Sequence, residues 1–389
     1  MRNFRKCISA FSLCLVHFPN SSAAQATPKL ADLWTGKAHF EQVGQFNWQS
    51  TSDQHSESAG WFTVRDGIWY VFNRAYINRN VDYCPIDHAR IVVRESSDQG
   101  KHWSAPIIAV EPGDSPGADD CNALDGSTYF DQRTGTWHML SQCLAKNESS
   151  RWALCHYTRR SKSPMGKFLS DNANPVVRGG ALWSHICAGT HKSCSVYTQD
   201  EGTPEILGKH KGLYIVTFHG WLPSTGQGVR GVAGTKDFRS WQTKGNDLPN
   251  DAIFTFKDCY TWLAGCVGIG ATSTYIGKSF AYIIGEVMNK SLACQKGQKW
   301  VFELFRVPRG PWPRSGAGKW QKLPGAPLLE PTWPDSDTPC QLGYARWIVD
   351  KRDLYLVYED WGPDRKFVNR RLLKLIAGPG PRIKKTNQN

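Results

Sequence analysis

The stretch "SAGWFTVRDGIWYVFNR" at residues 58–74 combines a small-residue start, an apolar strand, a polar turn and an aromatic-rich strand. The pattern recurs four times, at residues 125–143, 202–220, 268–286 and 342–360. Its five turn residues are Gly67, Gly135, Gly212, Gly277 and Asp353. Recurrence at a nearly constant spacing is the signature of a repeat architecture, in which each copy is one supersecondary unit.

Each copy is followed by a third apolar stretch, for example "ARIVVRESSD" at residues 89–98. Short strands with alternating character and regular turns are typical of an all-β fold. A unit of three or four strands cannot bury its own faces, whereas five units in a ring can. The sequence therefore predicts a five-bladed β-propeller, with residues 39–48 adding a closing strand beside the last blade. A β-sandwich, or two stacked all-β domains, is the alternative.

A second stretch, "ESSDQGKHWSAP" at residues 95–106, predicts a tight hairpin turn. Asp98 can accept a hydrogen bond from backbone nearby, Gly100 can adopt a positive φ, and the Trp103 ring can cover the turn. Within it, "SSDQGKHW" resembles the Asp-box, S-x-D-x-G-x-x-W, of sialidase-like propellers. That resemblance implies a structural element on the outside of a blade, which supports the fold and says little about chemistry.

The N-terminus reads as a secretory signal over residues 1–26. It has a basic start "MRNFRK", an apolar core "CISAFSLCLV" and a small-residue site "AQA". No later segment is long and apolar enough to cross a membrane. We therefore expect a secreted or periplasmic protein, with residues 27–389 forming a single propeller domain.

The cysteine content and the net charge limit which partners the protein is expected to have. Two of the 12 cysteines lie in the signal, and an even number in an exported chain predicts disulfides. Cys187 with Cys194, and Cys259 with Cys266, can each close a single loop. Paired CxxC elements are absent, so no metal or cofactor is expected. The net charge of +13 attracts polyanions, but export argues against nucleic acid. The expected partner is a carbohydrate, which the charge allows to be acidic.

Three acids precede the repeated strands. Glu57 lies ten residues before Gly67, Asp125 ten before Gly135, and Glu201 eleven before Gly212. Taken singly, each is equally well explained as a turn cap or a solvated loop residue. Together they predict carboxyl groups that meet at the axis of the ring. Glycoside cleavage needs such a set, because one carboxylic acid protonates the leaving oxygen while another, ionised, activates water or attacks the sugar.

This arrangement resembles the five-bladed propeller glycosidases: arabinanases, β-xylosidases, arabinofuranosidases and invertase-like enzymes. "LDGSTYFDQRTG" is similar to the family's second-blade motif, which implies that Asp125 tunes the pKa of the acid. "EGTPEILGKHKGLYIV" looks like its third-blade Glu-Gly-Pro motif with one extra residue, which implies Glu201 as general acid and Glu205 as the competing assignment. The first-blade base or nucleophile is unsettled between Glu57 and Asp53. The predicted substrate-binding residues are His55, Asp120, Glu205, Arg346, Trp61 and Trp221.

Two other functions remain open. A sialidase-like exo-glycosidase would need three arginines around the sugar carboxylate, for which Arg74, Arg90, Arg230 and Arg346 are candidates. The first repeat lacks that family's Phe-Arg-Ile-Pro signature, and five repeats are one short of its six blades. A non-catalytic carbohydrate-binding propeller lectin would keep the aromatic residues without needing paired carboxyl groups.

Overall fold

A computed structural model describes most of the chain after residue 26. The described residues are 27–46, 48, 52–78, 81–84, 88–148, 151–187, 200–222, 227–249, 252–255, 258–259, 266, 268–288, 300–310, 312–313, 319–325, 327–330, 342–361 and 368–380. Within them the fold is almost entirely β. It is accompanied by one 3-10 helix, η1 (Leu30–Thr35), and one short α-helix, α1 (Ala181–Cys187).

The described strands form one sheet of four strands and two sheets of eight. Each eight-stranded sheet consists of two antiparallel four-stranded units joined by one parallel pairing, and we describe the units in chain order. Unit 1 contains β2 (Gln54–Arg65), β3 (Ile68–Ile77), β4 (Ala89–Ser96) and β5 (Ile107–Val110). Unit 2 contains β6 (Asn122–Asp131), β7 (Thr136–Leu144), β8 (Ala153–Arg160) and β9 (Leu169–Ser170). Unit 3 contains β10 (Gly202–His210), β11 (Leu213–Leu222), β12 (Gln227–Thr235) and β13 (Trp241–Gln242).

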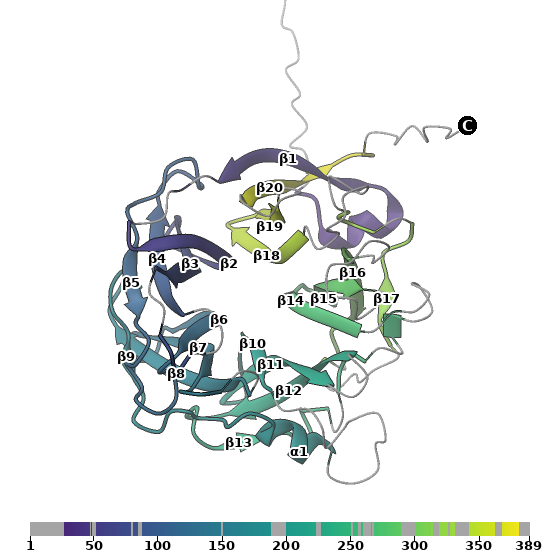
Figure 1. Ribbon diagram of the computed structural model, residues 1–389. Helices are drawn as coiled ribbons and strands as arrows, with labels where there is room; N and C mark the ends of the chain where they lie inside the picture. Colours follow the sequence, from purple (N-terminus) through teal and green to yellow (C-terminus); the bar gives the residue numbers. More distant parts are fainter. Residues whose placement is uncertain are drawn as a thin grey trace, which may run out of the picture.

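The last two units complete the ring. Unit 4 contains β14 (Gly268–Ile276), β15 (Phe280–Met288), β16 (Trp300–Pro308) and β17 (Gln321–Lys322). Unit 5 contains β18 (Leu342–Asp350), β19 (Asp353–Trp361), β20 (Val368–Ala377) and β1 (Ala38–Phe46). In Figure 1 the units surround one axis, with β2, β6, β10, β14 and β18 innermost. The molecule is therefore an all-β propeller, as the repeat predicts.

The ring is closed by pairing between the first and last of the described strands. β1 pairs antiparallel with β20, from Ala38 opposite Ala377 to Phe46 opposite Arg370. This confirms the prediction that residues near 39–48 add a strand beside the last repeat. Neighbouring units are also joined by single parallel pairings, such as Ala89 with Asn122, and by isolated backbone hydrogen bonds, such as that from the Phe168 amide to the Ala109 carbonyl.

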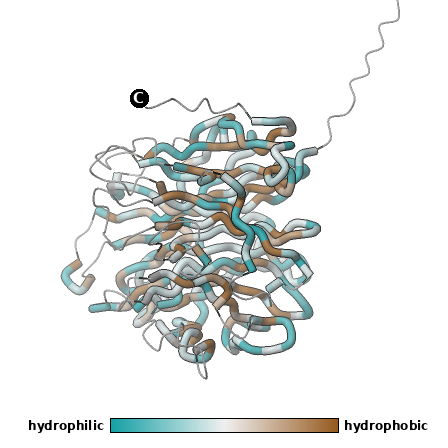
Figure 2. The backbone as a smooth tube through the Cα atoms, turned by 90° about the vertical axis from the view of Figure 1, so that its right-hand side faces the viewer, coloured by the Kyte–Doolittle hydropathy of each residue, from teal (hydrophilic) through white to brown (hydrophobic). Residues whose placement is uncertain are grey.

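The hydrophobic core is divided into five layers, each between two adjacent units. Between units 1 and 2 it includes Trp61, Phe72, Trp137 and Tyr157, and Trp61 stacks on Phe72 with ring centroids 5.4 Å apart. In the side view of Figure 2, hydrophobic segments recur through the depth of the ring. Large aromatic rings fill the wedge between sheets, which explains the high tryptophan content.

The turn at residues 95–106 has the geometry that the sequence predicts. Gly100 has a φ of +86°, and its amide donates to the Ser96 hydroxyl at 2.8 Å. Asp98 accepts the amide of His102 at 2.9 Å. The Trp103 ring packs edge-on against Phe46 of β1, with centroids 5.3 Å apart. The turn therefore helps to hold unit 1 against the closing strand.

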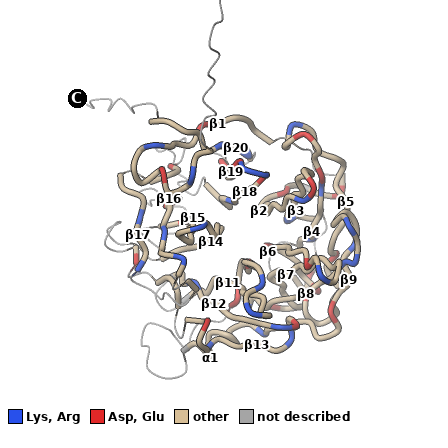
Figure 3. The backbone as a smooth tube through the Cα atoms, turned by 180° about the vertical axis from the view of Figure 1, so that it is seen from behind, with Lys and Arg blue, Asp and Glu red and all other residues tan. Residues whose placement is uncertain are grey.

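Charged residues are distributed around the whole ring, as Figure 3 shows from behind. This agrees with a sequence in which the basic residues are spread along the chain rather than gathered in one run. Among the described residues, no helix is long and apolar enough to cross a membrane.

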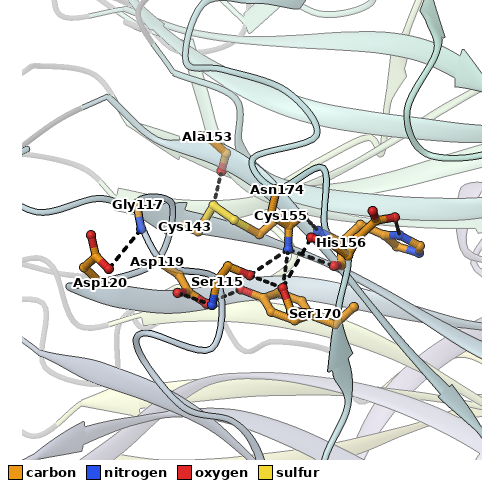
Figure 4. Close-up of a disulfide and its surroundings, with 12 residues drawn as sticks. Ser115, Gly117, Asp119, Asp120, Cys143, Ala153, Cys155, His156, Ser170 and Asn174 are labelled. Carbon is orange, nitrogen blue, oxygen red and sulfur yellow. Dashed lines mark hydrogen bonds and ion pairs between the residues drawn. A yellow bond between two sulfur atoms is a disulfide. The ribbon is translucent and has the colours of Figure 1, made fainter.

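Three disulfides lie in the described part of the chain: Cys84–Cys121, Cys143–Cys155 and Cys259–Cys266. The last confirms one of the two predicted loop closures, whereas Cys194, needed for the other, lies outside the described residues. Figure 4 shows Cys143–Cys155 beside a polar network. In that network, the carboxylate of buried Asp119 accepts the Ser115 amide at 2.8 Å.

Candidate active site

Every inner strand is interrupted by a β-bulge near its start, where two residues have no partner on the second strand. The bulges lie between Ser58 and Trp61, Ala123 and Gly126, Gly202 and Glu205, Ile269 and Thr272, and Gly343 and Arg346. Bulges redirect side chains and are common beside functional sites. They also give a register for comparing the five units residue by residue.

This register corrects the expectation that the three predicted acids occupy equivalent positions. Glu57 and Glu201 each lie one residue before the bulge begins, at the position that Asn122 holds in unit 2. Asp125 lies inside the bulge instead. The count from the turn glycines failed because the loop after β6 contains four residues, whereas the loops after β2 and β10 contain two.

Glu57 is buried in an ion pair within unit 1. Its two carboxylate oxygens accept hydrogen bonds from Arg94 at 2.5 and 2.8 Å, and both side chains are 1% exposed. Arg370 of β20 donates to the Glu57 carbonyl. The carboxylate is therefore engaged by Arg94 within unit 1, while the backbone carbonyl of Glu57 contacts unit 5.

The Glu201 carboxylate is also hydrogen-bonded, in this case to backbone amides at the start of α1. Its carboxylate accepts amide hydrogens from Gly180 at 2.6 Å, Leu182 at 2.8 Å and Trp183 at 3.4 Å. Burial raises the pKa of Glu201 to about 8 despite these three bonds. The side chain is completely buried, so its observed contacts are those of a helix cap.

Asp125 lies instead with groups from units 1 and 5. Its carboxylate is 3.6 Å from Nη1 of Arg74 on β3, and its other oxygen has no hydrogen-bond partner among the described residues. Nη2 of the same arginine donates to the hydroxyl of Tyr344 at 2.9 Å. Burial alone would lower the pKa of Arg74, but Asp125 and Tyr344 outweigh it and raise that pKa well above its usual value.

Two further carboxyl groups complete this group of residues. Glu359 on β19 is 3% exposed and lies 3.6 Å from the Arg370 guanidinium. Glu286 on β15 accepts the amides of Tyr344 and Ala271, both at 3.1 Å. Burial raises the pKa of each glutamate to about 7, and the charge of Asp125 contributes to both shifts. We call Arg74, Asp125, Glu286, Tyr344 and Glu359 the axial cluster.

The cluster brings a carboxylate that faces an arginine together with buried carboxyl groups whose pKa values are raised. Arg74 places its guanidinium 3.6 Å from the carboxylate of Asp125. Glu359 has a pKa of about 7, so much of it carries a proton near neutral pH. Carboxyl groups whose surroundings separate their proton affinities are the arrangement that acid–base catalysis uses.

A second cluster of polar residues lies in unit 3. Asp200 accepts the amide of Trp221 at 2.7 Å, and burial raises the pKa of Asp200 to about 7. His219 lies 3.9 Å from Asp200, and burial together with Arg230 lowers the pKa of His219 to about 3, so the ring is neutral. Trp221, one of the predicted substrate-binding residues, is partly exposed and lies beside Asp200.

Asp53, a predicted catalytic residue, and the predicted binding residues Asp120 and Trp61 contact residues outside the axial cluster. Asp53 is on the surface, with its side chain 58% exposed and paired with Arg90. Asp120 accepts the Gly117 amide at 3.1 Å in the loop before β6 (Figure 4). Trp61 is 3% exposed in the core. His55 lies in β2, and its side chain is outside the described part of the structure.

Glu205 and Arg346 line an axial channel below the bulges. The channel has a volume of about 350 Å³ and is walled by all five inner strands. Glu205 accepts the amide and hydroxyl of Thr274 at 2.6 and 2.7 Å, which joins unit 3 to unit 4. Arg346 donates to the Thr272 carbonyl at 2.5 Å, and buried Arg230 donates to the Thr203 hydroxyl at 2.8 Å.

These contacts weaken the sialidase-like alternative. Arg230 and Arg346 are held by groups of the channel wall, and Arg90 is paired with Asp53 and Glu111. Of the four arginines considered, Arg74 is the one in the axial cluster. Among the described residues, no group of three or more His, Cys, Asp or Glu side chains is arranged to hold a metal ion.

Sequence reasoning missed Glu286 and Glu359 because both lie on second strands, whereas the acids were sought on inner strands. A signal was present: "IIGE" at residues 283–286 and "VYED" at residues 357–360 place acids at the ends of apolar runs. Charged residues are rarely buried unless they are paired or functional, so these acids are candidates on the same grounds as Asp125.

No protein-family model and no curated protein sequence matches this chain. Solved structures do match. A glycoside hydrolase aligns with a TM-score of 0.58 at 10% identity, covering 91% of this chain and 98% of its own. A thermostable family-43 glycoside hydrolase aligns with a TM-score of 0.55 at 14% identity, covering 84% and 94%.

A family 117 glycoside hydrolase from Zobellia galactanivorans aligns with a TM-score of 0.51 at 11% identity, covering 87% of this chain and 90% of its own. The alignments span nearly the whole described ring. At these identities the likeness establishes a shared fold: the chain has the β-propeller architecture of these hydrolases.

Proposed function

We propose that this chain is a glycoside hydrolase that acts at the axial cluster. The observation that carries the proposal is the meeting of three buried carboxyl groups, Asp125, Glu286 and Glu359, from three units of the ring. Two have pKa values of about 7, and the third faces an arginine. Retaining such groups without a catalytic or binding role would be costly, because buried charges destabilise a fold unless paired.

In this proposal Glu359 is the general acid. It donates its proton to the leaving oxygen as the glycosidic bond breaks. Asp125, which faces Arg74, supplies the second carboxylate, which either deprotonates the attacking water or attacks the anomeric carbon.

Glu286 and Tyr344 act as positioning residues. Glu286 accepts one hydrogen bond from a backbone amide in the bulge of unit 4 and another from an amide in the bulge of unit 5. It therefore fixes the two bulges relative to each other. One of these amides belongs to Tyr344, whose hydroxyl accepts from Arg74. The contacts from Glu286 to Tyr344 and from Tyr344 to Arg74 therefore fix the position of the guanidinium that faces Asp125.

The similar structures support this function, since each of the three described above is a glycoside hydrolase. Export, inferred from residues 1–26, is part of the same proposal. The three disulfides support it, because disulfides persist in oxidising compartments.

The test is hydrolysis of a panel of polysaccharides and nitrophenyl glycosides. Asp125→Asn should lose about 10²–10⁴-fold in kcat on every substrate that the wild type cleaves. Glu359→Gln should lose as much on polysaccharides but far less on nitrophenyl glycosides, because a good leaving group needs little protonation. Asp53→Asn is the control, and it should be unchanged because Asp53 lies on the surface.

Wild-type activity in folded Asp125→Asn would exclude the proposal. Binding of glycans without release of reducing sugar by the wild type would favour the lectin alternative instead. Thermal unfolding of each variant separates loss of catalysis from loss of fold.

A further inference from the structure

A second cavity lies between units 3 and 4, with a volume of about 610 Å³. Such a volume is within the range of small-molecule and oligosaccharide sites, roughly 300–1,000 Å³. Its described wall comes from the end of β10, the turn between β14 and β15, and the segment that follows β16. We call it the basic groove, defined by Lys209, His210, Lys278, Arg309 and Trp312.

The groove is remote from the axial cluster. Ala271, which contacts Glu286, lies near the start of β14, whereas Lys278 lies in the turn after that strand. Seven residues of extended chain span about 23 Å. Leu207 and Ile276 line both the groove and the axial channel, so the groove lies at the far end of the channel, on the opposite face of the ring.

All charged side chains in the described wall of the groove are basic. Lys209 is paired with Asp131 at 3.2 Å, and His210 lies 3.8 Å from Asp247. Lys278 and Arg309 are both exposed, and neither has an acidic partner among the described residues. Arg309 is anchored by a hydrogen bond from its guanidinium to the Gly277 carbonyl at 3.3 Å, and the exposed guanidinium carries further donors that can face a ligand.

Apart from Ser279 and the glycines, the rest of the described wall is apolar or aromatic. Ile215 and Ile276 contribute aliphatic surface. Trp312 is partly buried and packs edge-on against Trp320, with centroids 5.4 Å apart. A pyranose ring presents C–H groups that suit an indole face, and its carboxylate or sulfate groups suit lysine and arginine.

We propose that the basic groove binds an anionic polysaccharide, one that carries carboxylate or sulfate groups. Charge complementarity selects a polyanion, and the three disulfides place the chain in compartments where polysaccharides, rather than nucleic acids, are the extended polyanions. The groove would hold the polysaccharide on the face of the ring opposite the axial cluster. Binding there is independent of whether the axial cluster hydrolyses it.

The experiment measures affinity of the full chain for polygalacturonate, heparin and neutral dextran by affinity electrophoresis and calorimetry. Lys278→Glu with Arg309→Glu should weaken binding of at least one anionic polymer by on the order of tenfold or more, since two charge-assisted contacts are lost. Lys351→Glu with Arg352→Glu is the matched control. It makes the same charge change in the exposed, equivalent turn of unit 5, whose residues do not line the groove.

Equal weakening by the groove pair and the control pair would overturn the proposal, since only net charge would then matter. Equal binding of neutral dextran, or preference for a single-stranded oligonucleotide over both anionic polysaccharides, would also overturn it. Asp125→Asn should bind the polymer as the wild type does. Loss of binding in Asp125→Asn would place the polymer at the axial cluster instead. If hydrolysis is never detected but the groove variant loses binding, this inference stands while the proposed function fails.

Discussion

Replacing Glu57 with glutamine should destabilise the fold and leave the chemistry intact. The substitution removes the negative charge that faces Arg94, whose guanidinium donates two bonds to Glu57 and whose side chain is 1% exposed. Breaking a buried ion pair by removing one partner costs about 3–5 kcal/mol, because the remaining charge is left uncompensated. Glutamine retains one acceptor oxygen, which places the expected loss near the lower limit.

Urea denaturation of wild type, Glu57→Gln, Arg94→Met and the double variant gives the required cycle. Each single substitution should lower the free energy of unfolding by about 3 kcal/mol. The double variant should recover much of this loss, since it contains neither buried charge. The recovery measures the coupling between the two side chains directly.

Enzyme assays on the same proteins decide the role of Glu57. Folded Glu57→Gln should keep its kcat within about twofold, because the carboxylate is fully engaged by Arg94 and lies outside the axial cluster. A variant with nearly wild-type stability and a kcat reduced about 10²-fold would refute this reasoning and restore Glu57 as base or nucleophile.

Two further outcomes follow from the structure. Since burial raises the pKa of Glu359 from its ordinary value of 4.5 to about 7, its acid form is lost as pH rises, so kcat should fall about tenfold per pH unit above 7. A pH–rate profile checks this, and the alkaline fall should vanish in Glu359→Gln on nitrophenyl substrates. Gly100→Ala should lower the free energy of unfolding by about 2–4 kcal/mol, because φ is +86° and the new Cβ would lie 2.2 Å from the Phe46 ring. Urea denaturation measures it, and a loss below about 1 kcal/mol would show that the turn and the Phe46 ring can move apart at little cost.

The fold was predictable because its signals are local. Apolar strands separated by turn residues such as Gly67 and Gly212 gave the repeat, and a strand pattern near residue 40 had no partner until the end of the chain. Gly100 was predictable for the same reason, since a positive φ strongly favours glycine.

The site was less predictable because it depends on register and on contacts between units. Asp125 was identified as a candidate, but its alignment with Glu57 assumed equal turn lengths. Glu57 and Glu201 look like free acids in the sequence. Their partners, Arg94 and the amides of α1, lie 37 and about 20 residues away and reach them only in the folded chain. Glu286 and Glu359 are likewise far from Asp125 along the chain, and only folding brings the three carboxyl groups together.

The closure of the ring by β1 and β20 has a consequence for biosynthesis. His39 hydrogen-bonds the carbonyl of Gly378, 339 positions later. Unit 5 therefore cannot be completed on the ribosome or at an export pore until the chain has emerged as far as Gly378. Units 1 to 4 can form earlier, but until then Trp69 of unit 1 lacks the apolar layer that Tyr355 and other residues of unit 5 supply. Contacts of such long sequence separation slow folding, so a nascent chain stays exposed to aggregation until its last strand arrives.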